Sequence, residues 1–321
     1  MKAIRIHEFG EPDVMQFEEI PDPVAGDGQV IVKVHAAGVN PLDTYLRAGA
    51  KIGAYAPTLP YTPGNDAAGI VVAIGAGVSR VKIGDRVYAQ PLTGSYAALA
   101  LCDQSQVYPL PAHVSFAQGS AVNISCRTAY YSLFTLGKAT AGEIVLIHGA
   151  SGSVGSAAVQ LAIAAGLTVI GTTSSDAGLQ LLQALGAHHV FNHRHPDYLN
   201  QIKTVTGDRG INIILEMAAN VNLTQDLSLM APAGRIIVIG GQGDVSIDPV
   251  QIIGLGISLI GVRLSLLDET TNAAIHQALY TSLEQGTLAP VVSQEIPLME
   301  APRAHREIEK AGTIGRICLI P

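Results

Sequence analysis

The residues whose types and spacing most clearly suggest a chemical role lie in "VLIHGASGSVGSAAVQLAIAAGLTVIGTTSSD", from Val145 to Asp176. This stretch reads as an apolar strand, a glycine-rich turn, an apolar helix and a second apolar strand. Gly152 would let the backbone approach a phosphate, and Gly155 would let the helix pack closely on the strand. The first amides of the helix, together with its dipole, would then favour an anion at this turn.

The glycine pattern is A-x-G-x-x-G, because Ala150 stands where the common motif has its first glycine. A glycine triplet alone is weak evidence, but a strand, triplet, amphipathic helix and second strand together favour dinucleotide binding. The alternative is a tight turn that binds nothing. A second match, "GAGVSR" at 75–80, precedes another strand-like run and is interpreted as a turn between strands.

Four hydroxyl residues, TTSS at 172–175, follow the second strand, where dinucleotide-binding chains often carry an acid. Such an acid binds a ribose diol and repels a 2′-phosphate, so its absence favours NADP(H). His193 and Arg194 are the nearest basic candidates. Two alternatives remain open: residues 174–176 simply cap the next helix, or Asp176 binds the ribose, which would favour NAD(H).

From about residue 144 onward, strand-like and helix-like segments alternate, and these would position the turn. Apolar runs at 144–147, 167–170, 190–191, 211–215, 235–239 and 257–264 are interpreted as strands, with helices over 177–185, 197–206 and 223–230. This order predicts an α/β fold with a doubly wound parallel sheet, the Rossmann arrangement. The first 120 or so residues show short period-two runs between glycines, which is typical of a β barrel or sandwich.

The chain has 321 residues, enough for two domains. Apolar residues make up 48% and charged residues 14%, well below the usual ~25%. The net charge is −7 and no run of Lys or Arg occurs, so no nucleic-acid partner is expected. Three scattered cysteines exclude a disulfide framework. Without a signal-peptide pattern or an apolar span, a cytoplasmic protein with no membrane partner is expected.

Several blocks together resemble one family. They are "VHAAGVNPLDTYLRAG", "LPYTPGNDAAG", "GDRVYA", "VLIHGASGSVG", "GAHHVFNHR" and "EMAANVNLTQDLSLMAPAGRIIVIG". They are similar to the quinone oxidoreductases of the ζ-crystallin type, the zinc-free branch of the medium-chain dehydrogenase/reductases. The resemblance implies a GroES-like β-barrel catalytic domain, residues 1–123 and 265–321, and a Rossmann NADP-binding domain, residues 124–264.

The resemblance also implies which residues bind the cofactor. By position these are Tyr45, Thr128, Ser151, Gly152, Ser153, Val154, Gly171, His193, Asn220, Val238, Ile239, Gly240, Gly241, Gly261, Val262 and Arg263. The hydroxyl residues after the second strand and the basic residues after the third strand add Thr173, Ser174 and Arg194 to the candidate cofactor-binding residues.

No metal site is expected. Zinc-bearing relatives have a cysteine where this chain has Asn40, and a histidine–glutamate pair where it has Asn65 and Asp66. They also carry four closely spaced cysteines after "GDRV", and none occurs here. Zinc needs about three or four Cys, His or carboxylate ligands in tetrahedral reach. The histidines at 188, 189, 193 and 195 could chelate a metal, but we interpret them as residues of the surface and of the cofactor edge.

Without a Lewis acid, the acceptor must be electrophilic by itself, as quinones and carbonyl-conjugated alkenes are. The candidate catalytic residues are Asn40, Tyr45, Tyr55 and Arg263: three donors to the acceptor oxygen, and Tyr55 to close the pocket. Asn40 could instead serve the turn before Pro41, Tyr45 could be a core aromatic, and Arg263 could form an ordinary ion pair.

The predicted function is an NADPH-dependent quinone oxidoreductase that works without zinc. The alternatives are a reductase of activated alkenes, such as enones or 2-haloacrylates, and an NADPH-binding protein with a structural or RNA-associated role. The apolar run "GISLIGVRL" at 256–264 would be an exposed sheet edge. We therefore expect a homodimer or homotetramer.

Overall fold

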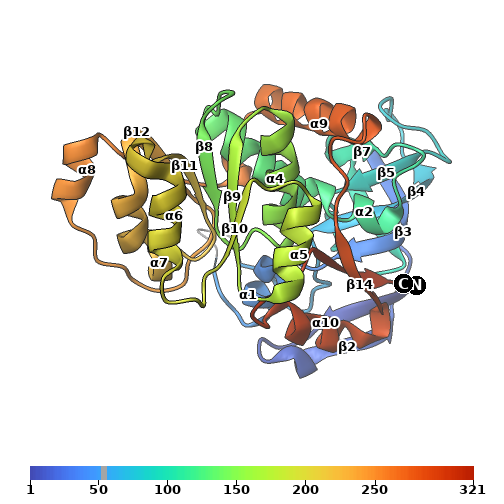
Figure 1. Cartoon of the computed structure of the whole chain (residues 1–321). Coiled ribbons are helices and arrows are strands. Elements are labelled where there is room, and N and C mark those ends of the chain that lie inside the picture. The colour runs from blue at the N-terminus through green and yellow to red at the C-terminus, as the bar shows by residue number, and fades with distance from the viewer. Residues whose placement is uncertain (52–55) are drawn as a thin grey trace. The chain divides into compact units, whose positions relative to one another are not determined.

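The structure, a computed structural model, describes residues 1–51 and 56–321. The chain forms two compact units, residues 1–124 with 290–321 and residues 125–289 (Figure 1). The second unit therefore extends past the domain end predicted at residue 264. It does so because α9 (Glu269–Glu284) packs against α3 (Arg127–Tyr130), where Nη1 of Arg127 donates to Oδ1 of Asn272 at 3.1 Å.

The second unit is built on a six-stranded parallel sheet with the order β10-β9-β8-β11-β12-β13. The strands are β8 (Ile144–Ile147), β9 (Thr168–Thr173), β10 (His189–Asn192), β11 (Ile211–Glu216), β12 (Met230–Val238) and β13 (Ser258–Gly261). The order reverses between β8 and β11, so the predicted doubly wound sheet is confirmed. In such sheets ligands bind beside the carboxyl ends of the strands at this reversal.

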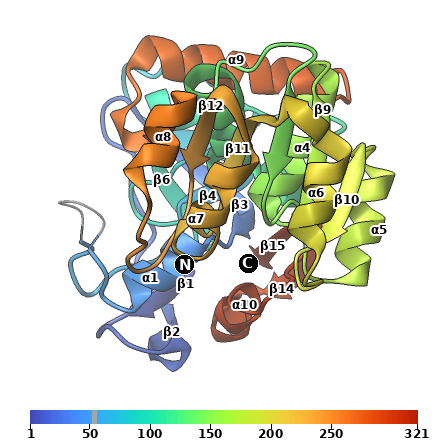
Figure 2. The same cartoon turned by 60° about the vertical axis from the view of Figure 1, so that its left-hand side comes forward.

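Helices cover both faces of this sheet. On one face lie α4 (Ser153–Ala164) and α5 (Asp176–Ala184). On the other lie α6 (Tyr198–Thr206), α7 (Ala219–Asp226) and α8 (Pro249–Leu255), as Figures 1 and 2 show. The helix predicted over 223–230 is shifted: α7 begins at Ala219 and ends at Asp226, because Met230 already starts β12. Tyr198, Ile202 and Leu223 pack against strand residues such as Ile144 and Ile214 to form this core.

The first unit is built on a mainly antiparallel sheet with the order β14-β15-β3-β4-β5-β7, and β6 also pairs with β3. The strands are β3 (Gln29–Gly38), β4 (Asp66–Ile74), β5 (Arg86–Ala89), β6 (Leu99–Asp103), β7 (Val107–Pro109), β14 (Val292–Pro297) and β15 (Arg316–Ile320). A separate hairpin joins β1 (Lys2–Ile6) to β2 (Met15–Glu19). Residues from the end of the chain therefore complete the sheet that its first third begins.

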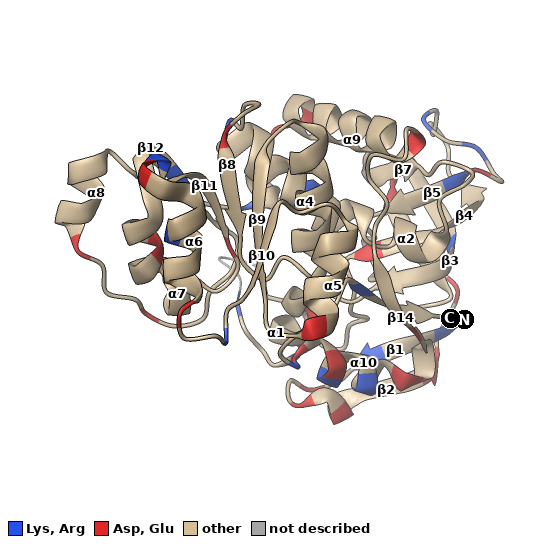
Figure 3. Cartoon of the chain, in the orientation of Figure 1, with Lys and Arg blue, Asp and Glu red and all other residues tan. Residues whose placement is uncertain are grey.

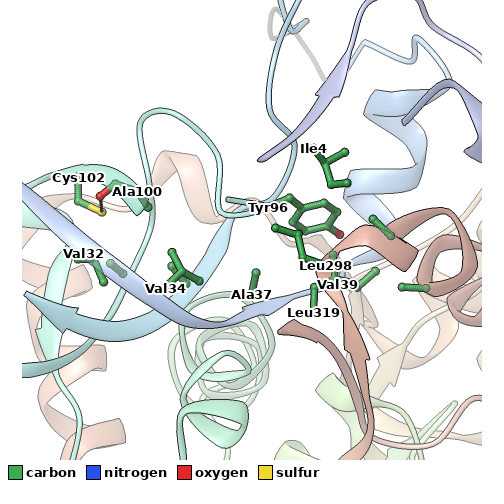
Figure 4. Close-up of a cluster of buried hydrophobic side chains, with 14 of the residues drawn as sticks. Ile4, Val32, Val34, Ala37, Val39, Tyr96, Ala100, Cys102, Leu298 and Leu319 are labelled. Atoms are coloured by element: carbon green, nitrogen blue, oxygen red, sulfur yellow. Dashed lines mark hydrogen bonds between the residues drawn. The ribbon is translucent and has the colours of Figure 1, made fainter. Parts of the chain in front are cut away.

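The core of the first unit fills the inner face of this sheet. Ile4, Val32, Val34 and Tyr96 are buried there together with Leu319 of β15 (Figure 4). The helices of this unit are α1 (Pro41–Arg47), α2 (Phe116–Gly119) and α10 (Ala301–Ile308). Because β3 leads directly into α1, the residues between them are held at the rim of the core.

Among the residues that the structure describes, no helix has the length and hydropathy needed to cross a membrane. Lys and Arg are interspersed with Asp and Glu in the view of Figure 3 and gather into no stripe.

Candidate functional site

The turn between β8 and α4 leaves the amino end of the helix open. α4 begins at Ser153, and no side chain of the described residues caps it. A Cβ on Gly155 would lie 2.5 Å from Cα of Ala150 and 2.6 Å from the carbonyl oxygen of Gly149. Glycine at 155 therefore allows the helix to start this close to the strand. The first amides of α4 are available to an anion.

Gly149 explains why alanine is tolerated at 150. The backbone of Gly149 is left-handed, with φ of 55°, and Ala150 is absent from the residues with positive φ. The amide of Ala150 donates to the carbonyl of Thr172 at 2.8 Å, which fastens the turn to β9. The position that requires glycine is thus one residue earlier than the common motif suggests.

Two of the hydroxyls at the end of β9 form hydrogen bonds with side chains of the same unit. Oγ1 of Thr172 lies 3.1 Å from Nδ1 of His148, and Oγ1 of Thr173 lies 2.9 Å from Oγ of Ser151. Both threonines are buried. Thr173 therefore orients a residue of the turn, while Thr172 points to a different cluster.

Ser175 caps α5, which is one of the alternatives that the sequence left open. Its Oγ accepts from the amide of Gly178 at 3.2 Å. Asp176 is the first residue of α5 and is exposed, and Ser174 between the strand and the cap is buried.

His193 and Arg194 lie next to this strand end. β10 pairs in parallel with β9, and the amide of His193 donates to the carbonyl of Thr173 at 3.0 Å. The amide of Arg194 donates to Oδ1 of Asn192, and its side chain is exposed. Because β10 lies beside β9, Arg194 follows the strand next to the one that Ser174 follows.

The other strands contribute two more loops. The amide of Ala219 donates to the carbonyl of Gly240 at 3.0 Å, and Oδ1 of Asn220 accepts from the amide of Gln242 at 3.0 Å. A Cβ on Gly240 would lie 2.4 Å from the carbonyl of Met217. The loops after β11 and β12 thus hold each other closely, and glycine at 240 is required for that contact.

The third loop follows β13. The amide of Val262 donates to the carbonyl of Val238 at 2.9 Å, which sets Gly261–Arg263 beside the end of β12. Nε of Arg263 donates to Oγ of Ser265 at 3.1 Å, and no acid pairs with this exposed guanidinium among the described residues. The structure therefore does not contain the ordinary ion pair that was the alternative for Arg263.

We call this set of loops, at the carboxyl ends of β8 to β13, the carboxyl edge. It holds most of the predicted cofactor-binding residues, whereas Thr128 is buried on α3 and Tyr45 lies on α1 of the first unit. The residues brought together are Ser151, Gly152, Ser153, Val154, Gly171, Thr173, Ser174, His193, Arg194, Asn220, Val238, Ile239, Gly240, Gly241, Gly261, Val262 and Arg263.

The four clustered histidines do not form a metal-ligating group in the described part of the chain. Nδ1 of His188 accepts from the amide of Val169 at 3.1 Å, and Nδ1 of His195 accepts from the amide of Asp197 at 3.2 Å. Their ring nitrogens serve the local backbone.

The first unit holds a buried polar cluster around Arg316. Nη1 of Arg316 donates to Oδ1 of Asn40 at 2.7 Å and to the carbonyl of Val39 at 3.1 Å. Nη2 donates to Oδ2 of Asp66 and to the carbonyl of Ser120. The Arg316 and Asp66 side chains are each 1% exposed. We call Asn40, Asp66 and Arg316 the guanidinium cluster.

Gly38 makes room for this cluster. A Cβ there would lie 1.6 Å from Nη2 of Arg316 and 2.3 Å from the carbonyl oxygen of Ser120. Nδ2 of Asn40 donates to Oδ2 of Asp66 at 3.0 Å. Because both polar atoms of the Asn40 side chain are engaged here, Asn40 has little capacity left for a substrate.

Comparisons with known proteins agree with both parts of the structure. Residues 26–120 match the family model described as "Alcohol dehydrogenase GroES-like domain", and residues 153–279 match the one described as "Zinc-binding dehydrogenase". A quinone oxidoreductase from Rattus norvegicus is 43% identical over 323 residues, which cover 100% of this chain and 98% of the relative.

The chain belongs to the quinone oxidoreductase family of the medium-chain dehydrogenase/reductases. The predicted family and the GroES-like and Rossmann fold class are therefore confirmed. The chain is also 31% identical to a 2-haloacrylate reductase from Burkholderia sp, over 99% of this chain and 98% of that protein. The solved structure of Escherichia coli quinone oxidoreductase complexed with NADPH superimposes with a TM-score of 0.91, at 28% identity and 100% coverage of both chains.

Within this quinone oxidoreductase fold, Asp43 lines a cavity of about 380 Å³ in the first unit, together with Arg5, Thr62 and Asn65. Oδ1 of Asp43 accepts from Nδ2 of Asn65 at 2.9 Å, and Oδ2 accepts from the hydroxyl of Tyr96 at 3.3 Å. Burial raises the pKa of Asp43 to about 6. The carboxyl can therefore change its charge near neutral pH.

A chain of hydrogen bonds behind Asp43 fixes its orientation. Nη1 of Arg47 lies 3.2 Å from Nδ1 of His305, and Nε2 of His305 lies 3.1 Å from the hydroxyl of Tyr96. Burial, and then the charge of Arg47, lower the pKa of His305 to about 3, so the ring is neutral. Since Arg47 donates to Nδ1, the ring hydrogen lies on Nε2 and every donor points toward Asp43.

The other predicted catalytic residues are less constrained. The side chain of Tyr45, on α1, is 36% exposed, so it is not the core aromatic that was the alternative. Tyr55 lies outside the described residues.

Sequence reasoning missed two clusters of this quinone oxidoreductase. One is the guanidinium cluster; its signal was a single Arg at the start of the apolar run "RICLIP". The other consists of His148, Glu216 and Asp226, which are buried at the carboxyl edge. Each of its acids was visible at the end of an apolar strand or helix, but no spacing rule joins the three.

Proposed function

We propose that this chain is an NADPH-dependent quinone oxidoreductase that reduces quinones and related electrophilic acceptors without zinc. The observation that carries the proposal is the uncapped amino end of α4, in a chain 43% identical end to end to a curated quinone oxidoreductase. The test is the oxidation of NADPH by the purified protein with 1,4-quinones, 2-enones and 2-haloacrylates as acceptors. No oxidation with any of the three would overturn it.

The carboxyl edge fits NADPH. The amides at Ser153 and Val154 would hold the diphosphate, and Asn220 and Gly240 would line the path of the cofactor, where a larger side chain at 240 would collide with the backbone. When bound, NADPH supplies a hydride from its nicotinamide ring. The protein's part is to orient the reactants and exclude water.

Arg194 is the residue that would recognise the 2′-phosphate of NADPH. It is exposed, it follows the strand next to the one that Ser174 follows, and it has no acidic partner among the described residues. A charge-assisted hydrogen bond is worth about 1.5–3 kcal/mol. Wild-type protein should therefore bind NADPH at least about tenfold more tightly than NADH, and Arg194→Ala should lose most of this preference.

Calorimetry measures both dissociation constants, since the chain has no Trp whose fluorescence could report binding. Arg209→Ala, at an exposed arginine of the same unit, is the control. Equal dissociation constants for NADPH and NADH in the wild type would refute the assignment.

Zinc independence is supported by the guanidinium cluster. Arg316 places a fixed positive charge against Asp66 and Asn40, two of the positions where the resemblance puts ligands in zinc-bearing relatives. A divalent cation beside this guanidinium would meet strong electrostatic repulsion. We infer that the acceptor is activated by hydrogen bonds and not by a metal.

We propose Tyr45 as a donor to the acceptor oxygen and Asn40 as a positioning residue, because the Asn40 side chain is engaged by Arg316 and Asp66. Arg263 is a second candidate donor, since no acid neutralises it among the described residues. Tyr55 keeps its proposed role of closing the pocket on sequence grounds alone.

Tyr45→Phe should lower quinone turnover on the order of 10²-fold, the usual effect of removing one donor to a developing oxyanion. The dissociation constant of NADPH should stay within about twofold if the hydroxyl acts on the acceptor alone. The control is Tyr280→Phe, which removes a hydroxyl bonded to Glu284 on its own helix. Unchanged turnover in Tyr45→Phe would remove Tyr45 from the site.

The reduction of activated alkenes is a second candidate, which the similarity to a 2-haloacrylate reductase favours. The acceptor panel above separates the two functions by the ratio of kcat/KM values. A structural or RNA-associated role gains no support from the view in Figure 3, in which Lys and Arg form no stripe.

We infer that the protein is a homodimer or a larger assembly formed through β13. This strand pairs only with β12 in the described sheet, and most of it is exposed, with Leu259 at 38%. Edge strands that expose apolar side chains are usually covered by pairing.

A further inference from the structure

His148, Glu216 and Asp226 form a buried cluster where the strand order reverses. Nε2 of His148 lies 2.9 Å from Oδ1 of Asp226 and 3.6 Å from Oε2 of Glu216. One ligand-type atom from each residue lies within 4.8 Å of the others. His148 follows β8, Glu216 ends β11 and Asp226 ends α7, so three elements of the carboxyl edge meet here.

Among the described residues, no Lys or Arg forms an ion pair with either acid of this cluster. Glu216 and Asp226 are each 0% exposed. Oε2 of Glu216 and Oδ2 of Asp226 are buried, with no hydrogen-bond partner among the described residues. Two adjacent buried carboxylates would repel each other strongly, and such pairs keep a proton. One proton between the two free oxygens would satisfy both.

The groups that face this acid pair come from every element around it. His148 contributes a ring whose Nδ1 lies 3.1 Å from Oγ1 of Thr172 of β9. A protonated His193, after β10, would repel a protonated His148. Burial, and then the charges of Asp226 and Glu216, raise the pKa of Tyr198 on α6. Burial lowers the pKa of His148, which disfavours a charged ring that could balance the two acids.

Glu216 connects the acid pair to the loops of the carboxyl edge. Its Oε1 accepts from the amide of Ala218 and from Nδ2 of Asn222 at 3.1 Å. Its backbone carbonyl accepts from the amides of Ile239 at 2.8 Å and Gly240 at 3.2 Å. A Glu216 side chain that turned away from Asp226 would therefore pull on the turn after β11, which holds Ala218 and Asn222.

We propose that Glu216 and Asp226 share one proton, and that this proton holds residues 217–220 in the conformation that binds the dinucleotide. The inference rests on the proposed function, because it concerns binding of the same cofactor. Both residues are positioning residues: neither is assigned a contact with the nucleotide. Loss of the proton places a second negative charge in the buried pair and loosens the turn.

The pH dependence follows from the raised pKa values. Burial raises the pKa of Glu216 and of Asp226 to about 7, from 4.5 and 3.8. The protonated pair therefore stabilises the folded state fully below the unfolded values, and this stabilisation is lost as the pH rises through about 7. NADPH affinity should fall over the same range, by about tenfold or more between pH 6 and pH 8.5.

The test is calorimetric titration of NADPH at pH 6 to 8.5, in two buffers of different ionisation enthalpy. Wild-type protein should take up about one proton on binding near pH 8 and show the loss of affinity. Asp226→Asn keeps an acceptor for His148 and gains an amide donor toward Glu216, which mimics the shared proton. This variant should bind NADPH at pH 8.5 at least about tenfold more tightly than the wild type.

The matched control is Asp208→Asn, at an exposed acid of the same unit, which should follow the wild-type profile. Titration of the cofactor's own 2′-phosphate is common to all variants and cancels in the comparison. An infrared band of a protonated carboxyl, present in the wild type at pH 6 and lost in Asp226→Asn, would report the shared proton without nucleotide.

The outcomes are distinct. An NADPH affinity that does not change with pH in the wild type, or changes equally in Asp226→Asn, overturns the inference and leaves the proposed function standing. A lack of NADPH binding by every variant at every pH overturns the proposed function itself. A stoichiometric metal in the wild type that Glu216→Gln loses would show a metal site in place of a shared proton.

Discussion

Replacing Arg316 by Met should lower the free energy of unfolding by about 3–5 kcal/mol, the usual loss when one partner of a buried ion pair is removed. The guanidinium donates to Asn40, Asp66 and the carbonyls of Val39 and Ser120, and its side chain is 1% exposed. Without it, the Asp66 carboxylate would remain buried with two donors from the described residues, Nδ2 of Asn40 and the amide of Ile124. Urea unfolding followed by circular dichroism measures the loss.

The double variant Arg316→Met/Asp66→Asn is the informative control. It removes the charge that the single variant leaves unpaired, so it should be more stable than Arg316→Met by about 1–3 kcal/mol. Arg235→Met, in the partly exposed pair with Glu143, should cost less than Arg316→Met. A single-variant loss below about 1 kcal/mol would show that Arg316 does not hold the guanidinium cluster together.

Gly155→Ala should weaken NADPH binding at least about tenfold and lower the free energy of unfolding by about 1–3 kcal/mol, as overpacking does. The new Cβ would lie 2.5 Å from Cα of Ala150 and 2.6 Å from the carbonyl of Gly149, both of them backbone atoms. The helix must therefore move away from β8, and its first amides move with it. Calorimetry gives the dissociation constant, and urea unfolding gives the stability.

Gly254→Ala is the matched control for this variant. Gly254 lies in α8 of the same unit, and a Cβ there would meet nothing within 4 Å. Alanine is the better helix former by about 1 kcal/mol, so this change should leave NADPH binding intact and slightly raise stability. If Gly155→Ala binds NADPH as the wild type does, the turn is not the place where the diphosphate is held.

The parts of the fold that follow from local patterns could be predicted from the sequence. The run from Val145 to Thr173 has a strand, a glycine turn, a helix and a strand in direct succession, and each is present. Short apolar runs also located the remaining strands of the parallel sheet. Their ends were less certain: β12 begins at Met230, because residues 230–234 continue the strand through "MAPAG", which reads as a turn.

The features that the sequence did not indicate depend on contacts between distant residues. Nothing near Arg316 in the sequence indicates that its guanidinium meets Asp66, because the two strands are joined only by folding. The cluster of His148, Glu216 and Asp226 arises where β8 and β11 become neighbours. Likewise, α9 joins the second unit through Arg127 and Asn272, a pairing between residues far apart in the chain.

The candidate site likewise has residues that the sequence could identify and roles that it could not. The residues of the carboxyl edge could be named in advance, because parallel strands bring all their carboxyl ends to one side of a sheet. Asn40 was expected to donate to the acceptor, but its partners Asp66 and Arg316, which engage its side chain, could not be read from the sequence. Asp43, on the helix that follows Asn40, is a similar case. The structure adds that it lines a cavity and has a pKa of about 6, which depends on burial that no spacing rule gives.

The most direct test of a metal-free, NADPH-dependent reductase is the rate of NADPH oxidation by 1,4-benzoquinone after exhaustive chelation, with the metal content of the same sample measured. The guanidinium cluster predicts an unchanged rate in protein that holds far less than one metal ion per chain. A rate that disappears on chelation and returns with added zinc would contradict it.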